Sequence, residues 1–135
     1  MTVQRLDHIV LAVQEMEQAI EAWAKTFELN PDPPIQPAGT NMELSFLQFD
    51  NAFLELVRAT TDDHRVARHV AEHGEGMFSI SLEVDDLDAA VRELRAKGAT
   101  VSDPEAGVLP NTRIARIPRA SAFGVAVQLI ERRQS

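Results

Sequence analysis

Two stretches of the chain repeat the same order of apolar and polar positions. Residues 6–13 are mostly apolar and are expected to form a strand, with the even-numbered side chains on one face and the odd-numbered ones on the other, and an amphipathic stretch follows them. Residues 77–84 and the stretch after them repeat this arrangement without a gap, so that Val13 matches Val84 and Ile20 matches Val91. The sequence therefore predicts an internal duplication, in which each copy begins with a strand followed by a helix.

The helical spacing is clear in both copies. In the first, apolar residues recur at the interval of one buried helix face, at Met16, Ala19, Ile20, Trp23 and Phe27. In the second, residues 87–94 repeat the pattern, Asp85 or Asp86 is placed to cap the start, and Gly98 is placed to end the helix. Between the copies, residues 62–74 are expected to form a linking helix that buries Val66 and Val70.

Further strands are expected after each helix. Residues 42–49 and 52–57 flank a short Asp50-Asn51 turn, which predicts a hairpin, and residues 113–117 and 125–130 form the matching pair. Weaker strands are expected near residues 30–36 and 100–103, the first limited by prolines to an edge or a loop. The predicted fold is α+β: two tandem βαβββ modules, residues 4–60 and 76–131, that form a cup-shaped mixed sheet and are joined by the helix at 62–74.

The duplication nominates four positions for chemistry. It pairs His8 with Ser79 and Glu55 with Gln128, each within an apolar strand. A carboxylate between Leu54 and Leu56 is costly to bury unless it is paired or binds a cation. An imidazole, a carboxylate and an amide oxygen that converge on one cleft suit a divalent metal. The alternative is that these polar side chains face solvent on a half-open sheet.

Composition narrows the partners. The chain has 135 residues, a net charge of −8 and no cysteine, which excludes disulfides, thiolate metal sites and a cysteine nucleophile. The acidic balance argues against nucleic acid as a partner, and no apolar run is long enough to span a membrane. No secretory leader is apparent at residues 1–4, so we expect a cytoplasmic protein.

Several strings resemble a known family. Leu6-Asp7-His8-Ile9-Val10-Leu11-Ala12-Val13 is similar to the opening of vicinal oxygen chelate proteins, the glyoxalase, bleomycin-resistance and dioxygenase superfamily. Residues 74–86 and 118–131 resemble the methylmalonyl-CoA epimerase branch most closely. The resemblance covers nearly the whole chain. It implies a glyoxalase-like fold and, because this fold carries many functions, indicates the activity less specifically.

The resemblance also implies a ligand set. Family members bind a divalent metal through one residue from the first and one from the fourth strand of each half. By position these are His8, Glu55 and Gln128, with Ser79 where the epimerases carry histidine. A serine hydroxyl is a much weaker ligand than imidazole, so three residues plus water would hold the metal. Hard ions such as Mg²⁺ or Mn²⁺ are favoured, while Co²⁺, Ni²⁺ and Zn²⁺ remain open.

The same resemblance implies roles in a reaction. Glu43 matches the glutamate that removes the proton beside the thioester carbonyl in the epimerases. Gln128 stands where those enzymes carry a second, glutamate base, and an amide cannot accept a proton in that way. One-base isomerisation or a lyase step therefore stays open. We expect Ser79, Arg113 and Arg116 to contact an anionic substrate.

Three functions remain in competition at this point. The first is a metal-assisted isomerase, epimerase or lyase that acts on a small carbonyl compound or thioester. The second is a metal-free binding protein of the bleomycin-resistance type, which Ser79 favours. The third is an extradiol dioxygenase, which Ser79 disfavours because iron would need histidine there.

The resemblance implies a homodimer. His69 and His73, four residues apart, are expected to be exposed helix residues and not a zinc site.

Overall fold

The computed structural model describes residues 1–133, and within them it has α-helices and a mixed β-sheet. The elements, in chain order, are β1 (Val3–Ala12), α1 (Met16–Phe27), β2 (Met42–Gln48), β3 (Phe53–Ala59), α2 (Arg65–His73), β4 (Gly76–Val84), α3 (Leu87–Ala96), β5 (Glu105–Ala106), β6 (Thr112–Ile117), a short 3₁₀ turn (Arg119–Ser121) and β7 (Ala126–Arg132). The α+β class predicted from the sequence is confirmed.

By contact, the chain groups into two compact units. We call Ile9–Phe78 the middle unit, and Met1–His8 together with the chain from Ser79 onward the end unit. The strands β1 and β4 each begin in one unit and finish in the other. The predicted modules 4–60 and 76–131 divide the chain in sequence order instead, and that division stays a prediction.

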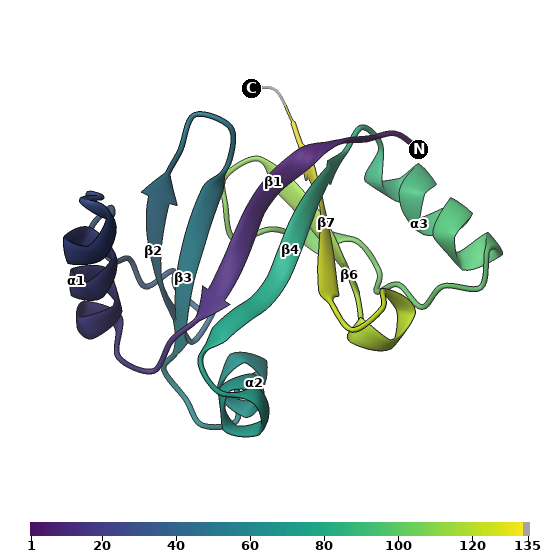
Figure 1. Cartoon of the computed structure of the whole chain (residues 1–135). Helices are drawn as coiled ribbons and strands as arrows, with labels where there is room; N and C mark the ends of the chain where they lie inside the picture. Colours follow the sequence, from purple (N-terminus) through teal and green to yellow (C-terminus); the bar gives the residue numbers. More distant parts are fainter. Residues whose placement is uncertain (134–135) are drawn as a thin grey trace. The chain divides into compact units, whose positions relative to one another are not determined.

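The middle unit contains the predicted hairpin (Figure 1). Strands β2 and β3 pair antiparallel from Met42 opposite Ala59 to Gln48 opposite Phe53. The turn at residues 50–51 is closed by the Phe49 amide, which donates to the Ala52 carbonyl at 3.0 Å. The expected hairpin is thus confirmed, and the weak strand near residues 30–36 is reduced to a single bridge at Ile35.

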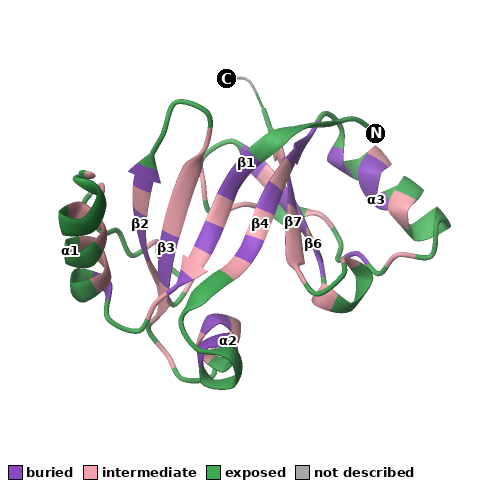
Figure 2. Ribbon diagram, viewed as in Figure 1, coloured by how far each residue is buried: buried purple, intermediate pink, exposed green. Residues whose placement is uncertain are grey.

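Helices cover both faces of this hairpin. Met16 of α1 packs with Leu47 and Leu56 on one face, whereas α2 packs Val66 and Val70 with buried residues of the other face. Figure 2 shows the outer side of α1 exposed. Phe27, expected in the buried stripe of α1, is 58% exposed, because it lies in the last turn of the helix.

In the end unit the strand order is β4-β7-β6-β5. Strand β7 runs parallel to β4 and antiparallel to β6. Helix α3 packs Leu87 and Val91 against Ala115 and Leu129 of one sheet face. Asp86 caps α3 by accepting a hydrogen bond from the Ala89 amide at 3.0 Å, which settles the choice that the sequence left open.

Two expectations about local structure are wrong. Residues 100–103 do not form a strand: the Ser102 amide donates to the Arg116 carbonyl at 2.9 Å, but the Ser102 side chain takes the Arg116 amide and Arg95 takes the Val101 carbonyl, so β5 begins only after Pro104. His69 is buried and not exposed: its ring lies edge-on against Phe78 at 5.0 Å.

No helix in residues 1–133 is long and apolar enough to cross a membrane.

Candidate active site

The sheet face of the end unit opposite α3 carries a row of polar side chains across three strands. Ser81 of β4 is in register with Gln128 of β7, and Gln128 is in register with Arg116 of β6. Side chains in register lie on the same face, so these three are neighbours across the sheet. Ser79 is two residues earlier on β4 and shares this face because strand side chains alternate.

His8 lies against this row. Its Nε2 atom is 3.0 Å from the Ser81 hydroxyl, and its Nδ1 atom is 2.7 Å from the carboxylate of Asp7. Gln128 donates to the same Ser81 hydroxyl oxygen at 3.1 Å, so the hydroxyl hydrogen is left to donate to His8. We therefore assign the proton of the His8 ring to Nδ1, where the ionised carboxylate accepts it.

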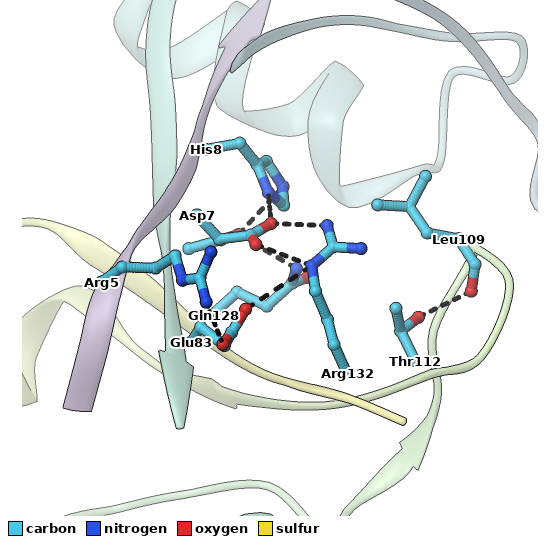
Figure 3. Close-up of polar contacts among 9 residues, drawn as sticks. Arg5, Asp7, His8, Glu83, Leu109, Thr112, Gln128 and Arg132 are labelled. Carbon is cyan, nitrogen blue, oxygen red and sulfur yellow. Dashed lines mark hydrogen bonds and ion pairs between the residues drawn. The ribbon is translucent and has the colours of Figure 1, made fainter. Parts of the chain in front are cut away.

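Arg132, at the end of β7, completes the network (Figure 3). Its guanidinium donates to both carboxylate oxygens of Asp7, at 2.7 and 2.8 Å. Burial by itself raises the pKa of Asp7, but hydrogen bonds from Arg132 and His8, together with the charge of Arg132, outweigh burial and hold the pKa well below its ordinary value. Asp7 is consequently an anion throughout the physiological pH range, and its carboxylate can accept a hydrogen bond from the Nδ1–H of His8.

These residues fit a divalent metal by the chemistry of their donors. Histidines that bind metals usually donate their second ring N–H to a carboxylate, as His8 does to Asp7. Gln128 adds an amide oxygen nearby, whereas Ser79 offers only a neutral hydroxyl. Within residues 1–133, no three His, Asp or Glu side chains form a ready metal cluster, so a metal here depends on amide and water ligands.

The network resembles a serine–histidine–carboxylate triad in its distances but not in its access. Ser81 is completely buried, and its oxygen accepts the Gln128 amide hydrogen instead of facing a cleft. A nucleophile needs contact with substrate and a free lone pair. We therefore interpret Ser81 as a residue that holds His8 and Gln128 in place.

Glu55 and Glu43 lie in the middle unit, on opposite faces of the hairpin. Glu55 of β3 is two residues before Val57, whose face packs on α2. Glu43 of β2 is two residues before Ser45 and opposite Arg58, whose Nε atom donates to its carboxylate at 2.9 Å. The structure thus turns the predicted base and the predicted ligand to different faces of the two strands.

The two arginines expected to bind substrate do not converge either. Arg113 faces α3, where it donates to both carboxylate oxygens of Asp88 at 3.0 and 3.1 Å. Arg116 lies in the polar row next to Gln128 and forms an ion pair with Glu105. Of the two, Arg116 is therefore placed beside the candidate site.

The sequence reasoning missed Asp7, Ser81 and Arg132. Asp7 had a signal, because a buried carboxylate directly before a histidine can orient its ring. Ser81 had a weaker one, its place on the same strand face as Ser79. Arg132 had none, since 125 positions separate it from Asp7 in the sequence.

Comparison with known proteins places the chain in a family. A model of the Glyoxalase/Bleomycin resistance protein/Dioxygenase superfamily matches residues 7–115. The chain belongs to this superfamily. Among curated superfamily proteins, the mitochondrial methylmalonyl-CoA epimerase of Dictyostelium discoideum is 22% identical over 96% of this chain and 80% of its own length. That of Bos taurus is 24% identical over 77% of this chain, which spans only 60% of that relative.

Solved structures of the superfamily share the fold. A variant of the Streptomyces coelicolor methylmalonyl-CoA epimerase, in complex with 2-nitronate-propionyl-CoA, aligns with a TM-score of 0.88 at 24% identity, over 97% of this chain and 96% of that one. The Mycobacterium tuberculosis methylmalonyl-CoA epimerase aligns with a TM-score of 0.86 at 25% identity, over 98% and 90%. The resemblance predicted from the sequence strings is thereby confirmed.

Proposed function

We propose that the chain is a metal-assisted enzyme that removes the proton next to a carbonyl, in the epimerase, isomerase or lyase class. The observation that carries this proposal is the Asp7–His8 pair, in which a carboxylate 2.7 Å from Nδ1 fixes the ring as in metal-ligating histidines. The relatives whose names specify methylmalonyl-CoA support a small acyl thioester as the substrate.

In this proposal the residues of the end unit bind and orient. His8 and Gln128 would hold the metal, and Glu55 would be the further ligand that the family resemblance implies. A divalent metal bound there would supply positive charge beside the substrate carbonyl and so favour loss of the neighbouring proton. Arg116, beside Gln128 in the polar row, attracts the anionic group of the substrate at the cost of its ion pair with Glu105.

The proposed base, Glu43, lies in the middle unit. Glu43 is the sole carboxylate of β2, and the family resemblance assigns it the proton transfer. Its ion pair with Arg58, on the face away from Glu55, would have to break before it could act. Because Gln128 cannot serve as a second base, we propose a one-base reaction and not a two-base epimerisation.

Exchange of the substrate α-proton with deuterated water tests this function. Methylmalonyl-CoA and shorter 2-methyl acyl thioesters are incubated with protein loaded with Mn²⁺ or Co²⁺. We expect metal-dependent exchange that His8→Ala abolishes, that Glu43→Gln slows by about 10²-fold or more, and that the exposed-site control Asp103→Asn leaves unchanged. Exchange that persists in Glu43→Gln excludes Glu43, and absence of exchange with every thioester refutes the activity.

A second candidate function, metal-free binding of a small molecule, is favoured by one observation. The lone pair of His8 Nε2 that a metal needs accepts the Ser81 hydroxyl hydrogen in our assignment, at 3.0 Å. Ser79 adds no strong ligand. If thioesters bind with the same affinity in the presence and absence of a chelator, and no metal copurifies, the binding function replaces the enzymatic one.

A further inference from the structure

Within residues 1–133, the guanidinium of Arg132 forms ion pairs with two carboxylates, those of Asp7 and Glu83. Its two short contacts both go to Asp7, while Glu83 is 3.9 Å away and closer, at 3.4 Å, to Arg5. The side chain of Arg132 is 37% exposed, whereas that of Asp7 is 7% exposed. The guanidinium, on the last residue of β7, therefore reaches from a partly exposed position to a carboxylate that is already buried.

The bonding pattern at Asp7 is specific. Oδ1 accepts from Nε of Arg132 at 2.7 Å, and Oδ2 accepts from Nη2 of Arg132 at 2.8 Å. The His8 Nδ1 atom lies 2.7 Å from the same Oδ2. Two parallel N–H bonds from a planar guanidinium fix the plane of the carboxylate, which a single bond would leave free to rotate. Arg132 therefore binds the same oxygen, Oδ2, that lies against the His8 ring.

We propose that Arg132 is a positioning residue for His8, which it orients through Asp7 so that Nδ1 keeps the proton and Nε2 faces Ser81. The part of this inference that concerns metal affinity rests on the proposed function, but the part that concerns the ring proton does not. Neither Asp7 nor Arg132 touches the substrate in this account, and both act through the imidazole.

The test compares Arg132→Met, Arg132→Lys and the matched control Arg133→Met. Arg133 is the next residue; its side chain is 64% exposed and forms a long ion pair, at 3.7 Å, with Glu131. Replacing Arg133 by Met changes the net charge by the same amount as Arg132→Met but leaves the contacts of Asp7 in place. Two readouts are taken: ¹⁵N chemical shifts of the His8 ring in metal-free protein, which distinguish the two neutral tautomers, and the affinity for Mn²⁺ or Co²⁺. Circular dichroism of each variant checks that it is folded.

We expect wild type and Arg133→Met to show His8 with protonated Nδ1. Arg132→Met should show a mixture of tautomers and a metal affinity lowered about 10–100-fold, the usual effect of losing a group that supports a metal ligand. Arg132→Lys, with one donor point in place of two, should restore part of both. A folded Arg132→Met protein with an unchanged tautomer and affinity would overturn the proposal. If wild type binds no metal but the tautomer still shifts in Arg132→Met, the metal function fails and the positioning role stands.

Discussion

The Asp7 carboxylate links the stability of the fold to pH. Its pKa in the folded protein is below the ordinary value of 3.8, mainly because Arg132 and His8 outweigh the effect of burial. As pH falls, the unfolded chain therefore takes up this proton before the folded protein does. The stabilisation is complete above about pH 5 and is lost as pH falls through 3.8 toward the folded pKa.

The size of the effect follows from the contacts of Asp7. Hydrogen bonds to charged groups contribute about 1.5–3 kcal/mol each, and two come from Arg132. Burial of the carboxylate and partial exposure of Arg132 offset much of this, which leaves a net contribution on the order of 2 kcal/mol. In a domain of this size, a change of 2 kcal/mol corresponds to a shift of about 6–10 °C in the melting temperature.

Urea unfolding of wild type and Asp7→Asn at pH values from 7 to 2.5 measures this contribution. Between pH 5 and 2.5, wild type should lose about 2 kcal/mol more than the variant, whose amide does not titrate in this range. Asp103→Asn is the control, because Asp103 pairs with Arg95 but is 89% exposed, and exposed pairs contribute little. Parallel curves for wild type and Asp7→Asn would show that the Asp7–Arg132 pair does not stabilise the folded state.

Two further variants test individual contacts by urea unfolding at pH 7. Ser81→Ala removes the hydroxyl shared by His8 and Gln128 inside the sheet, and should cost about 1–3 kcal/mol, whereas Ser121→Ala in the 3₁₀ turn should have little effect. An unchanged midpoint for Ser81→Ala would mean that water or rearrangement replaces the hydroxyl. Asp86→Ala removes the cap of α3 and should cost about 1 kcal/mol; equal stability with wild type would contradict the capping role.

The elements with strong periodicity were predictable from the sequence. The helices near residues 16–27 and 87–94 and the hairpin around Asp50-Asn51 follow from local patterns, and all three are confirmed. Residues 100–103 were not predictable in the same way. The Ser102 hydroxyl takes the Arg116 amide and the Arg95 side chain takes the Val101 carbonyl, and these side-chain contacts cannot be read from the alternation of apolar residues.

The part of the candidate site that lies within the duplicated pattern could be predicted from the sequence. The duplication marked His8 and Gln128, and the structure connects these two through Ser81. It did not mark Asp7 or Arg132, because their partnership joins the two ends of the chain and has no counterpart in the other copy. Glu43 was assigned from the resemblance alone, and strand alternation, counted from Glu55 through the hairpin register, places it on the other face.

Isothermal titration calorimetry with a divalent metal determines whether the His8 ring, which Asp7 holds, is a metal ligand. Protein purified without chelator is stripped and titrated with Mn²⁺ or Co²⁺, alongside His8→Ala and the helix-surface variant His73→Ala. We predict one ion per chain for wild type and for His73→Ala, and none for His8→Ala. Wild-type affinity no better than about millimolar, or equal binding by His8→Ala, would contradict the claim.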